Sequence, residues 1–123
     1  MDKKEKFFNA IKEKGFNVSD NFFATIPIIA RHRKTPEGHH NIINNITIVN
    51  FAGCNTKKGD LGCVTFACKG VERKKFHKTE NYYQEQEIIK KAFCPKSVKE
   101  AIAAYTEFAT EAQKTMDSWQ MVM

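Results

Sequence analysis

Several features that would assign this chain to a familiar class are missing from its sequence. No window approaches the roughly eighteen consecutive apolar residues that a membrane-spanning helix needs. The N-terminal stretch MDKKEKFFNAIKEK carries charges where a signal peptide has its apolar segment. These absences predict a cytoplasmic protein without contact to a membrane.

Motifs for catalysis are missing as well. The stretch KKGDLG lacks the strand-to-helix context of a phosphate-binding loop, and no flanking signature selects a cysteine as a nucleophile. His39 and His40, with asparagines nearby, match a metal-dependent His-Asn nuclease core in composition only, since no further histidine follows at a suitable distance. We therefore predict a protein that is not an enzyme and holds neither a cofactor nor a metal.

The four cysteines include no Cys-x-x-Cys pair. Without a secretory signal we expect reduced thiols, although an oxidising compartment would allow two disulfides. An odd separation puts Cys63 and Cys68 on opposite faces of a strand, which argues against a shared zinc site. We interpret the cysteines as small buried apolar residues.

The chain does have the size and composition of a folded domain. Its 123 residues are 41% hydrophobic and include ten phenylalanines. These are enough large side chains to build a core that needs neither disulfides nor a metal ion for stability. No internal repeat or low-complexity tract divides the sequence. We predict that residues 1–123 form a single domain.

Positive charge is concentrated in the middle of the chain. The formal net charge is +6, and residues 57–78 hold seven basic residues against two acidic ones, a local net charge of +5. Residues 101–123 hold one lysine against three acids, a local net charge of −2. This distribution favours an anionic partner for the central segment.

Hydrophobic spacing predicts an α+β fold. Helices are expected from Asp2 to Lys14, over NYYQEQEIIKKAF, and from Val98 for about six turns along an apolar seam with small Ala109 and Ala112 at its middle. The segment FFATIPIIA fits a buried strand or a short helix, and Pro27 argues against a central strand. RHRKTPEGHHN is expected to be an exposed loop.

Three further segments predict an antiparallel meander: INNITIVNFAGC, CVTFAC and, after a tight turn at Lys69 and Gly70, VERKKFHK. The predicted architecture is a three- to four-stranded antiparallel sheet with two or three helices on one face, including the long C-terminal helix. The seam of that helix packs on the chain itself or pairs chains in a homodimer, so the protein is expected to be a monomer or a homodimer through this helix.

The run CKGVERKKFHKTENYY mixes cations with aromatic rings. Lysines on an edge strand guard against aggregation, which is one explanation of the charge. Rings beside cations are also typical of single-strand nucleic-acid binding, and the basic loop around Arg31 would extend the patch if the fold brings it near. The expected nucleic-acid-binding residues are Arg31, Arg33, Lys69, Arg73, Lys74, Lys75, Phe76, Lys78, Tyr82 and Tyr83.

Two functions follow from this run. The first is binding of DNA or RNA, mainly through phosphates and with low sequence specificity, because lysine outnumbers arginine. The alternative is a protein–protein interaction module, an inhibitor or adaptor that docks on an acidic or nucleic-acid-processing partner.

Overall fold

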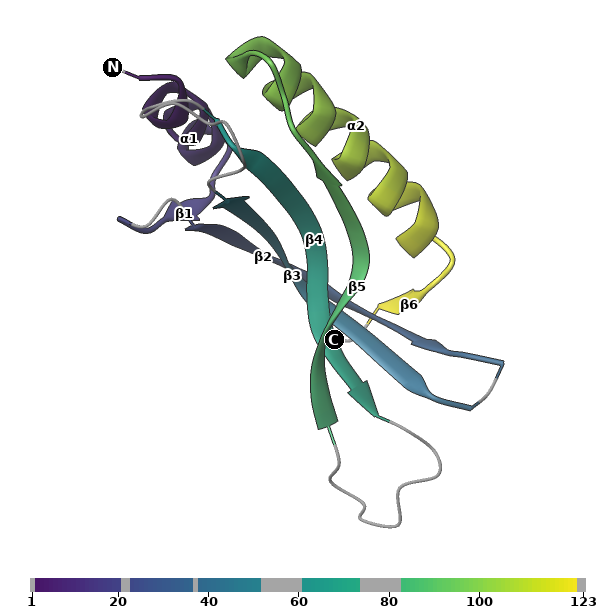
Figure 1. Ribbon diagram of the computed structural model, residues 1–123. Helices are drawn as coiled ribbons and strands as arrows, with labels where there is room; N and C mark the ends of the chain where they lie inside the picture. The colour runs from purple at the N-terminus through teal and green to yellow at the C-terminus, as the bar shows by residue number, and fades with distance from the viewer. Residues whose placement is uncertain (1, 21–22, 37, 52–60, 74–82, 122–123) are drawn as a thin grey trace.

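The computed structural model describes residues 2–20, 23–36, 38–51, 61–73 and 83–121. They form an α+β fold in which two helices pack on one face of an antiparallel sheet of six strands (Figure 1). The predicted sheet of three to four strands is therefore wrong. The elements are α1 (Lys3–Glu13), β1 (Asn17–Val18), β2 (Phe23–Lys34), β3 (His40–Phe51), β4 (Cys63–Arg73), β5 (Tyr83–Phe93), α2 (Val98–Met116) and β6 (Gln120–Met121). Neither described helix is long and apolar enough to cross a membrane.

The strands follow one another across the sheet in the order β1-β2-β3-β4-β5. The short strand β6 pairs with β2 on the same side as β1, further along β2. Side chains of successive residues point to opposite faces. Ile48 and Phe66 are directly paired and fully buried on the face that the helices cover. The other face carries a row of Cα partners, Thr25, Thr47, Ala67 and Lys90, and we call it the helix-free face.

Helix α1 agrees with its predicted range. Asp2 is its N-cap and accepts a hydrogen bond from the Glu5 amide at 2.8 Å, which satisfies one of the free N–H groups of the first turn. Gly15, with φ 102°, adopts the left-handed conformation just past the helix. The face formed by Phe7, Phe8 and Ile11 is buried in the core.

Helix α2 begins where the sequence predicts and ends earlier. Ser97 accepts a hydrogen bond from the Glu100 amide at 3.1 Å and so caps the first turn. Part of the predicted seam, including Ala112, is buried in the core of the same chain, and Phe108, beside the seam, stacks on Phe66 with ring centroids 5.6 Å apart. The helix ends at Met116, because the residues beyond it turn back and pair with β2 as β6.

Strand β2 includes the proline that argued against a strand. The pairing of β2 with β3 shifts register between Pro27 and Arg31, so the proline lies at a bulge. On the other side of β2, β1 ends its pairing at Thr25 and β6 begins at Arg31. On the side of β2 that faces away from β3, no described strand therefore pairs with Pro27. The predicted loop RHRKTPEGHHN is wrong in extent, since Arg31–Lys34 continue β2 and His40 begins β3.

Strand β4 passes straight through the predicted turn at Lys69 and Gly70, so the three-stranded meander is wrong. Gly70 is paired within the sheet, opposite Ile43 and Gln86. A Cβ atom there would lie 1.6 Å from the carbonyl oxygen of Ile42, so the glycine permits a close approach of two strands. The sequence predicted a turn at this glycine, whereas the structural reason for the glycine is the close approach of the neighbouring strand.

Strand β5 replaces the helix predicted over NYYQEQEIIKKAF. Ile89 and Phe93 are four residues apart, a spacing that puts two side chains on one face of a helix and equally on one face of a strand. Pairing with β4 over its full length, from Tyr83 opposite Arg73 to Phe93 opposite Val64, decides for the strand. In this segment acidic residues come first and lysines last, an order that suits the dipole of a helix. Pairing with β4 overrides this local preference.

The antiparallel pairing of β4 with β5 also brings Cys63 next to Cys94. Their Cα atoms are 4.3 Å apart and their sulfur atoms form a disulfide. The expectation of reduced thiols, which was based on the lack of a secretory signal, is wrong for this pair, because the pairing of β4 with β5 brings the two cysteines together. Cys68 is a free, buried thiol, as expected of a small core residue, and Cys54 lies outside the described residues.

Candidate nucleic-acid interface

Two of the predicted basic segments meet at one end of the sheet. Register places Lys34 opposite His40, His40 opposite Arg73 and Arg73 opposite Tyr83 in four successive strands. We call these four positions the hairpin end. Figure 1 shows that the strand pairs β2–β3 and β4–β5 both reach this end of the sheet. Arg73, where the described part of the second basic segment ends, therefore lies close to the basic segment around Arg31, although 42 residues separate Arg31 from Arg73 in the chain.

The turn between β2 and β3 is short and hydrogen-bonded. The Thr35 amide donates to the His39 carbonyl at 2.8 Å, and the Thr35 hydroxyl oxygen accepts from the His39 amide at 3.0 Å. Gly38 has φ 87°, a left-handed conformation that glycine adopts without strain. These bonds hold Lys34 and His40 in place at the hairpin end.

Arg31 ties the sheet to the end of α2. Its guanidinium Nη1 donates to the carbonyl oxygens of Met116 and Trp119, each at 3.4 Å. A cation at the C-terminal end of a helix satisfies free carbonyl groups and complements the helix dipole. The structure thus gives this predicted binding residue a structural role.

Arg33 belongs to a polar chain that crosses three strands. Its guanidinium lies 4.4 Å from the centroid of the Trp119 ring, and its Nε donates to Asn41 Oδ1 at 3.1 Å. Asn41, only 2% exposed, donates from Nδ2 to Glu72 Oε2 at 3.0 Å. The chain Trp119–Arg33–Asn41–Glu72 holds β2, β3 and β4 together close to the hairpin end. Sequence reasoning missed its last two members, because nothing in one sequence indicates cross-strand partners.

A histidine pair lies on the other side of the same strands. His32 follows Arg31 and precedes Arg33, so its side chain points to the helix-free face. His32 Nε2 and His40 Nδ1 are 2.8 Å apart, and the two rings are parallel within 7°. One nitrogen donates the shared proton and the other accepts it. His40, expected in a solvated loop, is thus held by a strand partner.

Lys69 lies further along the helix-free face. Its ammonium group is 5.9 Å from the centroid of the Phe23 ring, and Phe23 is 36% exposed. The sequence predicted Phe23 as part of the core. The alternation of β2 puts it instead on the face without helices, opposite Val49.

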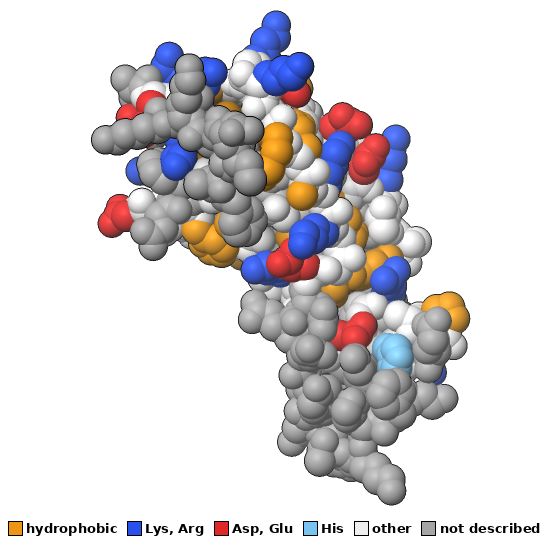
Figure 2. Space-filling view, in the orientation of Figure 1, with side chains coloured by type: hydrophobic (Ala, Val, Ile, Leu, Met, Phe, Trp, Pro, Cys, Tyr) orange, Lys and Arg blue, Asp and Glu red, His pale blue; other side chains and the backbone are white. Residues whose placement is uncertain are grey.

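Several predicted residues lie outside the part of the chain that the structure describes: Lys74, Lys75, Phe76, Lys78 and Tyr82. For Arg73 and Tyr83 the structure gives the backbone position at the hairpin end. Elsewhere, Figure 2 shows blue and red side chains side by side on the coloured part of the surface, without a block of one sign. Among the described residues, no three histidine, cysteine or acidic side chains form a group that could hold a metal ion.

Comparison with known proteins adds no relative. No family model, no curated protein and no solved structure matches this chain.

Proposed function

We propose that this protein binds nucleic acid at the hairpin end, through phosphate contacts of low sequence specificity. The observation that carries the proposal is the register of Lys34, His40 and Arg73 in three adjacent strands, which brings two basic segments of the chain together. This register supports the proposal because it brings the end of β2, which carries Lys34, close to Arg73, the last described residue before Lys74 and Lys75.

The chemistry of these segments favours the phosphate backbone. Lys34 is exposed, and the sequence continues from Arg73 directly into Lys74 and Lys75, with Lys78 following. Lysine is a flexible point charge that finds phosphate without reading base edges. Because Arg31 and Arg33 already bond within the chain, lysines carry the expected contacts.

The helix-free face offers a continuation from the hairpin end. Lys69 lies on this face in β4, four residues before the backbone position of Arg73. Beyond Lys69 the exposed ring of Phe23 lies next to its ammonium group. An exposed ring beside a cation is the arrangement on which a base of a single strand stacks. A single strand that begins at the hairpin end would therefore meet a second phosphate contact and then a stacking surface.

The test compares charge reversal at the hairpin end and on the helix-free face with charge reversal at the start of α2. We expect Lys34→Glu with Lys69→Glu to weaken binding of labelled oligonucleotides, measured by fluorescence anisotropy, by about tenfold or more at low salt, and to lower the salt slope by about two. Lys96→Glu with Lys99→Glu changes the net charge equally on exposed positions beside the start of α2, at the opposite end, and should leave affinity unchanged.

The outcome separates the two predicted functions. Equal loss in both variants would show a general charge effect and would contradict a site at the hairpin end. Absence of binding to single-stranded DNA, single-stranded RNA and duplex DNA at about 50 mM salt would refute the nucleic-acid proposal. The expectation of a protein–protein interaction module would then remain, with partners that survive nuclease treatment.

A further inference from the structure

Strand β5 leaves one long edge of the sheet without a described neighbour. It pairs with β4 along one side, and the strand order ends there. At the other border of the sheet, β2 is partly covered by the short strands β1 and β6. A strand at an edge presents a row of N–H and C=O groups that can pair with another strand. The eleven residues of β5 are long enough for such pairing.

The charges of β5 are ordered by sign along the strand. Glu87 precedes Ile88 and Ile89, and Lys90 and Lys91 follow. If two copies of β5 pair antiparallel with Ile88 opposite Ile89, Glu87 of each copy lies opposite Lys90 of the other. A parallel arrangement in register would place Glu87 opposite Glu87. The strand is thus complementary to itself in this antiparallel register and not in the parallel in-register arrangement.

A bulge gives this pairing a consistent face. Residues three apart in a regular strand point to opposite faces, yet Glu87 is paired with Lys69 and Lys90 with Ala67, two positions of β4 that share the helix-free face. The register shift between Cys68 and Lys69 accounts for the extra residue. Glu87 Oε2 and Lys90 Nζ are 3.4 Å apart, which agrees with side chains on one face. Two copies would therefore bring four alternating charges together on that face.

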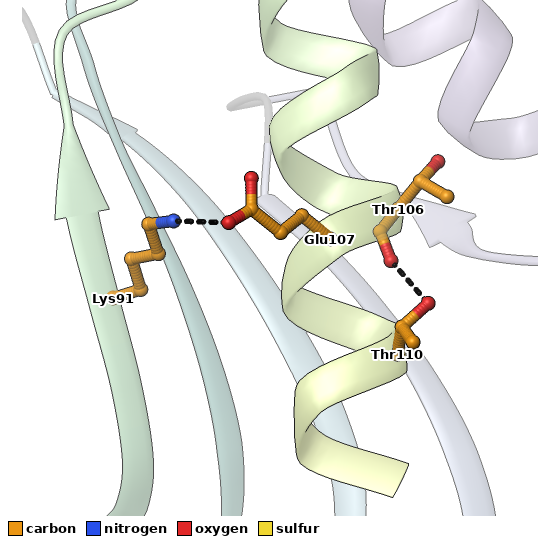
Figure 3. Close-up of polar contacts among 4 residues, drawn as sticks. All are labelled: Lys91, Thr106, Glu107 and Thr110. Atoms are coloured by element: carbon orange, nitrogen blue, oxygen red, sulfur yellow. Dashed lines mark hydrogen bonds and ion pairs between the residues drawn. The ribbon is translucent and has the colours of Figure 1, made fainter. Parts of the chain in front are cut away.

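The lysine next in the chain has a different partner. Lys91 lies opposite Phe66 on the face that the helices cover, and its Nζ is 3.9 Å from Glu107 Oε1 of α2 (Figure 3). Glu87 and Lys90 remain 38% and 55% exposed. Ile88 and Ile89, at the centre of the suggested pairing, are only half-buried and have apolar surface left to cover.

We propose that two copies of this chain associate through antiparallel pairing of β5, with Ile88 opposite Ile89 and Glu87 opposite Lys90 in both directions. The result is one sheet that continues through both copies. This homodimer uses the sheet edge, whereas the predicted homodimer used the C-terminal helix, where Ala112 and part of the apolar seam pack in the core of the same chain. The inference does not depend on nucleic-acid binding.

The experiment is a charge swap followed by sedimentation equilibrium over a range of protein concentrations. Wild-type protein should show a concentration-dependent dimer. Glu87→Lys or Lys90→Glu alone puts like charges opposite each other and should weaken the dimer about tenfold or more. The double variant, Glu87→Lys with Lys90→Glu, should restore it. An equimolar mixture of the two single variants should form a mixed dimer, because each is complementary to the other.

A matched swap on α2, Glu111→Lys with Lys114→Glu, alters two exposed charges away from β5 and should leave the dimer unchanged. All substitutions are at exposed positions, and circular dichroism verifies the fold. A wild-type protein that stays monomeric at every concentration would overturn the proposal. So would a dimer that no β5 variant weakens, or one that the double swap and the mixture fail to restore.

Discussion

Asn41 is the central link of the polar chain near the hairpin end, so its removal tests whether that chain holds the sheet together. The side chain is 2% exposed, accepts from Arg33 and donates to Glu72. Asn41→Ala removes both bonds and leaves two charged groups without this partner. A hydrogen bond to a charged group contributes about 1.5–3 kcal/mol. Because Arg33 is exposed and water replaces its lost acceptor, we expect a total loss of about 2–3 kcal/mol.

Urea unfolding followed by circular dichroism measures this loss. With a slope of about 1.5–2 kcal/mol per molar urea, the midpoint should fall by roughly 1–2 M at an unchanged slope. Asn41→Asp keeps an acceptor for Arg33 but sets a second carboxylate beside Glu72, and it should destabilise the protein at least as much. Asn44→Ala, at an exposed position of the same strand, serves as the control and should cost under about 0.5 kcal/mol. Equal midpoints for Asn41→Ala and Asn44→Ala would refute the structural role of the chain.

Two further predictions concern the core. Phe66 is fully buried against the rings of Phe93, Tyr105 and Phe108. Phe66→Ala should therefore lower the free energy of unfolding in urea by about 3–5 kcal/mol, whereas Phe23→Ala on the helix-free face should lower it far less. Similar losses in the two variants would contradict the assigned faces. Burial raises the pKa of the Cys68 thiol from 9.0 to about 11, so this group's contribution to stability is complete below pH 9 and is lost as the pH rises towards 11. Unfolding free energies should therefore fall more steeply over that range in wild type than in Cys68→Ala, and parallel curves would exclude the effect.

The helices were predictable because their signals are local. Asp2 and Ser97 are side-chain caps next to apolar residues at helical spacing, and both helices begin beside them. The strands were harder, since their partners are distant in sequence. Ile89 and Phe93 fit a helix or a strand, and only pairing with β4 decides between them. Gly70 indicated a turn, while its structural reason is the carbonyl oxygen of Ile42 on the neighbouring strand.

The candidate site shows the same division. Residue types alone indicated which side chains suit a nucleic acid: cations such as Lys69 for phosphates and aromatic rings for bases. Composition did not reveal that Arg31 and Arg33 bond within the chain, because their partners at Met116, Trp119 and Asn41 are brought near by the fold. The exposure of Phe23 likewise depends on which face the helices cover.

The central claim, that nucleic acid binds at the hairpin end, is tested most directly by following backbone amide signals in two-dimensional NMR during titration with a single-stranded oligonucleotide at low salt. The largest shifts should fall on Lys34, His40 and Arg73, with smaller ones at Lys69 and Phe23, and should reverse when salt is added. Absence of shifts at saturating oligonucleotide, or shifts centred on α2 and the opposite end of the sheet, would contradict it.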